Sequence, residues 1–247
     1  MSDGLKLFIL GSARSGTSIT YYAARDVLGL VGRGESHVFP IFHRMMHQYF
    51  LYAKSFKDTK GTLARELDVR EYKLYMQEYV RSFYKRTYPG DSFVDKTPGG
   101  ESVNCAPFIL ETFPDACMVA TRRTGIEVVQ SFQLKFAAGF EDACRNWANC
   151  MQALHRIHGL MPQILSIDQY ELTNTPDDVA ARLAAHVGRP ELAGDLAGYF
   201  ASKRTDQTSE HDWRERLTLD RVNWTDEQKV HFRKTCGPAM ELFGYPM

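Results

Sequence analysis

Short apolar runs bounded by turn residues recur along the chain and predict buried parallel strands. Four such runs cover residues 5–10, 92–95, 117–121 and 164–168. Between them, apolar residues three and four positions apart predict helices, which run from the loop after the first strand to about Leu28 and over residues 70–86, 103–112, 125–137 and 141–160. Strands that alternate with helices favour an α/β fold with a central parallel sheet flanked by helices.

The clearest predicted helix carries recognisable start and stop signals. Thr175 can cap it, Pro176 suits the first helical position, and Asp177 and Asp178 complement the helix dipole. Gly188 can end the helix in a left-handed conformation.

Residues 37–60 form a different kind of segment, rich in aromatic residues, methionine and histidine. One interpretation is a helix that packs on the core and ends in exposed lysines. The other is a wall of an acceptor pocket, since methionine and aromatic side chains adapt to apolar ligands. Periodicity alone does not decide between the two.

Composition narrows the function classes. The 247 residues predict one domain over residues 1–247, and 30 basic against 30 acidic residues give no excess for nucleic acid or an anionic membrane. No apolar stretch reaches the ~20 residues of a membrane span, and the N-terminus does not resemble a secretory signal. Five cysteines without Cys-x-x-Cys pairing indicate free thiols in a reducing cytoplasm and no zinc site.

The stretch GSARSGTS, residues 11–18, has the glycine spacing of a phosphate-binding loop but places Thr17 where the Walker lysine belongs. A glycine loop between a strand and a helix is an anion site, because free N–H groups and the helix dipole both face the ligand. Arg14 adds a charge, and Thr17 and Ser18 add hydroxyls. The strand at 117–121 leads into arginines rather than a Walker B aspartate, so Arg14 and Arg123 suit a phosphate bound without metal.

A second pattern lies in ATRRTGIEVVQSF. Ser131 follows Arg123 by eight residues, just over two helical turns. An arginine at the helix entrance and a serine on its flank can grip one phosphate together. Alone, this spacing is more typical of a surface arginine and an ordinary helical serine.

In this order, the two patterns resemble the nucleotide-binding signatures of sulfotransferases that use 3′-phosphoadenosine 5′-phosphosulfate (PAPS). FVDKTPGG resembles that family's D/E-K-T-P element, and IDQYELTNTPDD its tyrosine–glutamate turn. The resemblance implies a P-loop-containing nucleotide hydrolase-like fold, PAPS as co-substrate, its desulfated product PAP, and no metal. It assigns the 3′-phosphate to Arg123 and Ser131, and the 5′-phosphosulfate to Arg14, Ser15, Gly16, Thr17 and Ser18. Many members have Arg-Asp-Pro where Thr124 and Gly125 follow Arg123 here, and many have lysine in place of Arg14.

Sulfuryl transfer also needs a base and cations on the leaving oxygen. Arg14 is the candidate for the leaving group, and Lys96, just after a strand end, for the bridging oxygen or the acceptor. GRGESHVFP resembles an element of glycan-modifying and bacterial members in which the glutamate is the base, which favours Glu35. A glutamate base needs burial to work near neutral pH, whereas His37 needs none, so His37 stays an alternative.

Lys203 and Arg204 begin a polar stretch that, by the resemblance, closes over the nucleotide; a solvated surface loop is the other reading. The acceptor is expected to be a small metabolite with a free hydroxyl, less readily an amine or a long polyanionic glycan. The alternatives are a P-loop kinase and a non-catalytic PAP(S)-binding module. The oligomeric state stays open.

Overall fold

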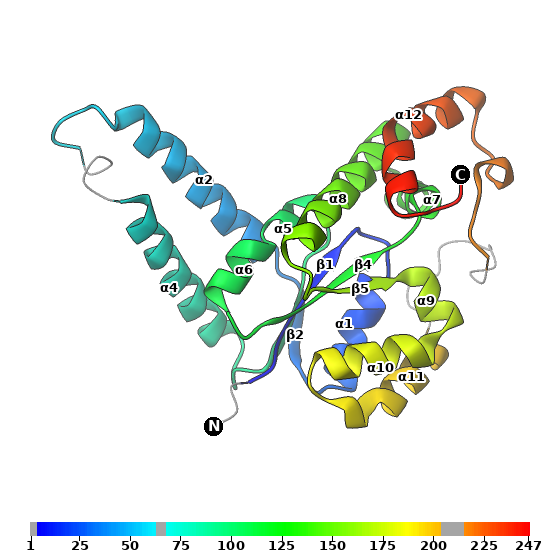
Figure 1. The fold of residues 1–247 in the computed structure, drawn as a ribbon, viewed down its shortest axis with the longest axis horizontal. Helices are drawn as coiled ribbons and strands as arrows, with labels where there is room; N and C mark the ends of the chain where they lie inside the picture. The colour runs from blue at the N-terminus through cyan, green and yellow to red at the C-terminus, as the bar shows by residue number, and fades with distance from the viewer. Residues whose placement is uncertain (1–3, 63–67, 204–214) are drawn as a thin grey trace.

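The computed structural model describes residues 4–62, 68–203 and 215–247. A five-stranded, fully parallel sheet runs through its centre (Figure 1). In spatial order the strands are β2 (Val31–Glu35), β3 (Phe93–Lys96), β1 (Lys6–Gly11), β4 (Cys117–Arg122) and β5 (Leu165–Asp168). The strands β2 and β3 thus lie on one side of β1, and the later strands β4 and β5 lie on the other. The crevice at the carboxyl ends of the strands, where the strand order reverses in this way, is where α/β sheets bind ligands.

Four of the strands are those predicted from the apolar runs, whereas β2 was missed. Its sequence, Val-Gly-Arg-Gly-Glu, alternates between exposed and half-buried positions and contains two glycines. This is the pattern of an edge strand without a continuous apolar run. The miss matters because β2 ends on Glu35.

Helices connect and cover the strands. They are α1 (Thr17–Asp26), α2 (Val38–Phe56), α4 (Val69–Thr87), α5 (Gly100–Asn104), α6 (Ala106–Thr112), α7 (Gly125–Phe136), α8 (Phe140–Leu160), α9 (Gln169–Asn174), α10 (Pro176–His186), α11 (Ala193–Ser202) and α12 (Asp226–Leu242). The single helix predicted over 103–112 is wrong, because Cys105 ends α5 and caps α6, and Pro107 in the first turn of α6 has no N–H to continue α5.

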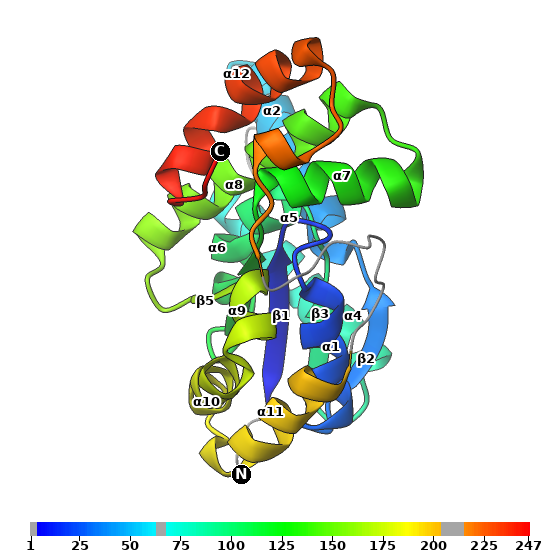
Figure 2. The same cartoon turned by 90° about the vertical axis from the view of Figure 1, so that its right-hand side faces the viewer.

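The two faces of the sheet bury alternate residues of each strand. Leu7 and Ile9 of β1 pack with α1, α10 and α11, whereas Phe8 and Leu10 face the opposite layer. Figures 1 and 2 show α5, α6 and α8 on that opposite side. Both faces are covered, as the near-continuous apolar runs require.

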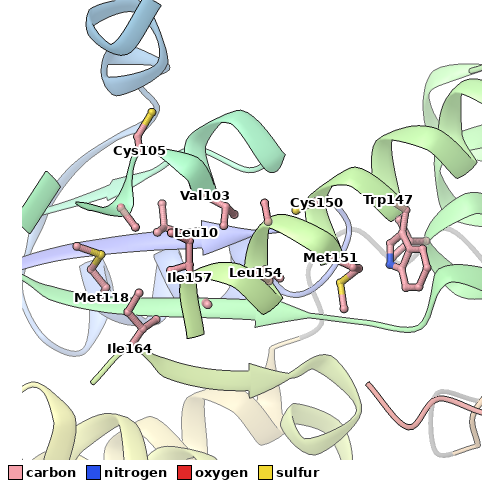
Figure 3. Packing of buried hydrophobic residues seen from close by; sticks show 14 of the residues in the cluster. Leu10, Val103, Cys105, Met118, Trp147, Cys150, Met151, Leu154, Ile157 and Ile164 are labelled. Atoms are coloured by element: carbon pink, nitrogen blue, oxygen red, sulfur yellow. The ribbon is translucent and has the colours of Figure 1, made fainter. Parts of the chain in front are cut away.

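Helix α8 forms the centre of the larger core (Figure 3). Trp147, Met151 and Leu154 are at most 1% exposed, and they pack in one cluster with Leu10 and Val103. Each such side chain contributes about 1.5–3 kcal/mol by leaving water. The Trp147 indole also donates to the backbone oxygen of Arg123 at 3.0 Å, so the core holds the end of β4 in place.

The junction before α10 differs from its prediction. Thr175 is the N-cap residue, but its side chain makes no cap and instead donates to the Glu171 backbone oxygen at 3.3 Å. Pro176 starts the helix as predicted, and Gly188 follows it at φ 69°. The backbone oxygen of Glu171 in the short helix α9 lies within reach of the Thr175 hydroxyl. The hydroxyl therefore donates to this oxygen and does not accept from the first-turn N–H groups of α10.

Helices α2 and α4 form an antiparallel pair that projects from the sheet (Figure 1). Helix α2 covers most of segment 37–60, and it is buried only at Phe39, Pro40, Phe42 and Ala53. Its base packs on the core, and the rest is largely exposed. Within the described residues, no helix combines the length and apolar character needed to cross a membrane.

Candidate functional site

The loop between β1 and α1 is shaped by two glycines in conformations that suit glycine. Gly11 has φ 129°, and a Cβ there would lie 2.0 Å from the Thr121 backbone oxygen of β4. Gly16 has φ 92° and is the N-cap of α1. A glycine cap has no side chain to accept from the first-turn N–H groups, so these groups are left for an anion.

Ser15 and Thr17 stiffen this loop from within. The Ser15 hydroxyl is fully buried and lies 2.9 Å from the Thr121 hydroxyl oxygen. Thr17 is also buried, at 4% exposure. Ser18, one position on, is half-buried and accepts a hydrogen bond from Lys96 Nζ at 3.1 Å. Ser15 therefore fixes the loop to β4, while Ser18 connects it to β3.

Arg14 stands at the outer turn of the loop in a left-handed conformation, φ 65°, that non-glycine residues seldom adopt. Its Nε donates to the Ser131 hydroxyl on α7 at 2.9 Å. Arg123 at the end of β4 donates from Nη1 to the Arg14 backbone oxygen at 3.3 Å. The structure thus brings together the three residues Arg14, Arg123 and Ser131 from distant parts of the sequence.

Glu127 is a member of this cluster that the sequence analysis missed. Its carboxylate lies 2.7 Å from Arg123 Nε, and the two side chains are 8% and 6% exposed. The other carboxylate oxygen accepts from the Leu217 backbone N–H at 3.2 Å. Burial lowers the pKa of Arg123, and the charge of Glu127 opposes that shift. An acidic residue four positions after Arg123 on a predicted helix was the available signal.

Glu35, Lys96 and His37 form a second group beside the start of α1. Lys96 Nζ lies 3.0 Å from Glu35 Oε1, and His37 Nε2 lies 3.4 Å from Glu35 Oε2. The Lys96 side chain is 9% exposed, whereas those of Glu35 and His37 are 41% and 58% exposed. Glu35 therefore lacks the burial that its sequence-based role assumed; it is an accessible carboxylate beside an ammonium group.

A buried carboxylate holds the Glu35–His37 turn. Asp95, at 3% exposure, accepts from the Ser36 hydroxyl at 2.8 and 2.7 Å and from the Tyr84 hydroxyl. The His37 backbone N–H donates to the Thr97 hydroxyl at 3.0 Å. His37 has φ 52°, a strained conformation that these bonds help to maintain. Burial raises the pKa of Asp95, while the bonds from Tyr84 and Ser36 oppose that shift.

Lys203 is the described residue of the predicted site that is not brought to the glycine loop. Lys203 follows α11 and is exposed; its charge acts on Asp26, the last residue of α1. Since α1 has ten residues, that end lies about 15 Å from Gly16. Arg204 lies outside the described residues.

The residues around the glycine loop combine groups that can bind an anion with a carboxylate that can accept a proton. The first-turn N–H groups of α1, which receive no side-chain cap from Gly16, can bind a multiply charged anion together with Arg14 and Lys96. The accessible Glu35 carboxylate beside it can accept a proton. Among the described residues, no group of three or more His, Cys, Asp or Glu side chains is placed to hold a metal ion.

Comparison with solved structures gives the same fold at low sequence identity. The sulfotransferase STF9 of Mycobacterium avium aligns with a TM-score of 0.57 and 14% identity, covering 100% of this chain and 79% of that one. The sulfotransferase domain of the Synechococcus PCC 7002 olefin synthase aligns with a TM-score of 0.56 and 16% identity, covering 100% and 97%. The sulfotransferase domain of the curacin biosynthetic pathway gives 0.53 and 18%, covering 99% of each chain.

The comparison with curated proteins finds no significant match. The family comparison does, and it covers the loop, both charged groups and all five strands. Residues 6–193 match the sulfotransferase family. With about three quarters of its length matched, the chain belongs to the sulfotransferase family.

Proposed function

We propose that this sulfotransferase takes its sulfuryl group from PAPS and transfers it to the hydroxyl of a small acceptor. The observation that carries the proposal is the meeting of Arg14, Lys96 and Glu35 around the start of α1. Arg14 is held by Ser131 at 2.9 Å, and Lys96 is held between Ser18 and Glu35 at 3.1 and 3.0 Å. Two cations, Arg14 and Lys96, and a proton acceptor, Glu35, thus lie around the N-terminus of α1, which is the expected anion site.

The donor's 5′-phosphosulfate is assigned to the glycine loop. Thr17 in place of a Walker lysine suits a donor that has no β- and γ-phosphates. The 3′-phosphate is assigned to Arg123 and Ser131, which already contact Arg14 by way of its backbone and side chain. Binding there would require Arg123 to share its guanidinium between the phosphate and Glu127.

Each group then has a role in transfer. The acceptor oxygen attacks sulfur, and the sulfur–oxygen bond to the 5′-phosphate breaks. Glu35 takes the proton of the acceptor hydroxyl as its oxygen bonds to sulfur. Lys96 and Arg14 stabilise the negative charge that develops on the leaving phosphate oxygen. PAP leaves with that charge, and the sulfated acceptor leaves without its proton.

Calorimetry with PAP, repeated with EDTA, tests the donor assignment. We expect PAP to bind equally well in both conditions, because arginine, lysine and backbone N–H groups supply the contacts. Radiolabelled PAPS with a phenol acceptor then tests transfer. Binding of ATP that requires Mg²⁺, with no binding of PAP, would contradict the proposal and point to a kinase.

A further inference from the structure

Helix α2 has an apolar side that the described residues leave uncovered. Ile41, Met45 and Tyr52 are 55%, 45% and 51% exposed. They line a groove of about 600 Å³ together with Tyr49 and Tyr72, whose rings stack at 3.7 Å. This volume lies within the range of small-molecule sites, about 300–1,000 Å³.

The groove begins beside the candidate base. His37 is the N-cap of α2, and Ile41 follows it by four positions, about one helical turn or 6 Å. Met45 and Tyr52 continue the same side of the helix at eight and fifteen positions. From Ile41 to Tyr52 the groove extends over about 17 Å.

A charged pair connects the groove to α5, the helix after β3 and Lys96. Arg44 of α2 makes a two-pronged hydrogen-bonded pair with Glu101 of α5, including Nη2 to Oε2 at 2.5 Å. Glu101 follows Lys96 by five residues. That link fixes α2 against α5, the helix that follows Lys96 in the chain.

We infer that this groove holds the body of the acceptor, and that the acceptor is an elongated, uncharged alcohol or phenol. Aromatic and aliphatic side chains form its walls, and Arg44, the one charged group among the described residues that line it, is already paired with Glu101. Among the described lining residues no second cation is available to a polyanion, whereas an alkyl or aryl chain would cover the exposed apolar surface. The hydroxyl end would lie at Glu35. Transfer to it rests on the proposed function; binding in the groove does not.

A series of 4-alkylphenols, from 4-ethylphenol to 4-octylphenol, tests this inference with radiolabelled PAPS. We expect kcat/KM to rise about fourfold for each added methylene until the groove is filled, since each buried methylene contributes about 0.8 kcal/mol. Met45→Glu should remove most of this chain-length gain while leaving 4-ethylphenol nearly unaffected. Phe50→Glu is the matched control, because Phe50 is similarly exposed, at 48%, on the other side of α2. It should behave as the wild type.

Calorimetry of 4-octylphenol without nucleotide separates the inference from the proposed function. Tight binding that Met45→Glu abolishes, with no transfer from PAPS, supports the groove and contradicts the donor assignment. Transfer to phenols with no chain-length effect, or an equal loss in Met45→Glu and Phe50→Glu, overturns the groove and leaves the donor assignment standing. A dimer in sedimentation that Met45→Glu dissociates, with no binding of 4-octylphenol, also overturns it, since a second copy then covers this side.

Discussion

Among single residues, Glu35 combines its proposed role as base with a side chain that is 41% exposed. It ends the edge strand β2 and touches Lys96 on one oxygen and His37 on the other. The Lys96 ammonium lies 3.0 Å from Glu35 Oε1, beside the carboxylate that would accept the proton. Exposure on the other side leaves room for an acceptor hydroxyl.

Replacing Glu35 by glutamine tests its role as base. Glu35→Gln keeps the size and the contact with Lys96 but cannot take a proton, so turnover should fall by about 10²–10⁴ with PAP affinity unchanged. His37→Gln should cost much less. Turnover with labelled PAPS and calorimetry with PAP measure both effects. A normal rate in Glu35→Gln beside an inactive, folded His37→Gln would transfer the role to the histidine.

The test of Arg123 needs a second substitution, because its ion-pair partner Glu127 is buried with it. Removing Arg123 alone would leave the Glu127 charge unpaired, at a cost of about 3–5 kcal/mol in folding stability. We therefore compare Glu127→Gln with the double variant Arg123→Gln, Glu127→Gln. The double variant should bind PAP about ten- to a hundredfold more weakly and 5′-AMP nearly as well, because the lost contact is to the 3′-phosphate. Equal losses for both nucleotides in calorimetry would make Arg123 a structural residue.

At the scale of elements, the helix starts differ in how their N–H groups are satisfied. Thr225 accepts from the Gln228 backbone N–H at 3.2 Å, and the Gln228 side chain accepts from the Thr225 N–H at 2.9 Å. Thr175 occupies the same position before α10 without such a bond. Gly16 before α1 has no side chain at all, which leaves that helix start open at the site.

This contrast predicts unequal effects of one substitution at two caps. Thr225→Ala should lower the free energy of unfolding by about 1 kcal/mol, because the Gln228 N–H of α12 loses its side-chain acceptor. Thr175→Ala should cost less, because only the bond to the Glu171 oxygen is lost. Urea unfolding of both variants measures the difference. Equal losses would mean that the Thr225 cap adds nothing beyond an ordinary hydroxyl contact.

At the scale of the whole molecule, the buried Asp95 makes stability depend on pH. Burial raises its pKa in the folded protein above the value of about 3.9 that an unfolded chain has. As pH rises above about 4, the unfolded chain therefore releases this proton first, which favours unfolding. The contribution of Asp95 to stability is present below that pH and is lost as pH rises through the folded-state pKa.

The comparison of wild type with Asp95→Asn isolates this effect. We expect the free energy of unfolding of the wild type to fall relative to Asp95→Asn as pH increases from 4 upward. Urea unfolding of both proteins over that range measures the difference. A difference that stays constant or reverses its slope would mean that the hydrogen bonds from Ser36 and Tyr84 outweigh burial.

The sequence by itself determined the layered α/β fold, four of the five strands and the glycine loop. These follow from local patterns: buried strands are continuous apolar runs, and Gly11 and Gly16 mark a loop that a side chain at either position would disturb. Arg14 and Arg123 came from the glycine loop and the strand-to-helix pattern, Lys96 from its place after a strand, and Glu35 from the resemblance to the sulfotransferase family.

Only the tertiary structure decided how these residues meet. The edge strand β2 has no apolar run, so the pairing of Glu35 with Lys96 depends on β2 lying beside β3. Ser131 contacts Arg14 because α7 packs against the loop, whereas the pair of Arg123 with Glu127 follows from their spacing of four residues. The Asp95 hydrogen bonds and the groove on α2 likewise join residues far apart in the chain. Long-range packing sets such contacts, and one-dimensional periodicity does not encode them.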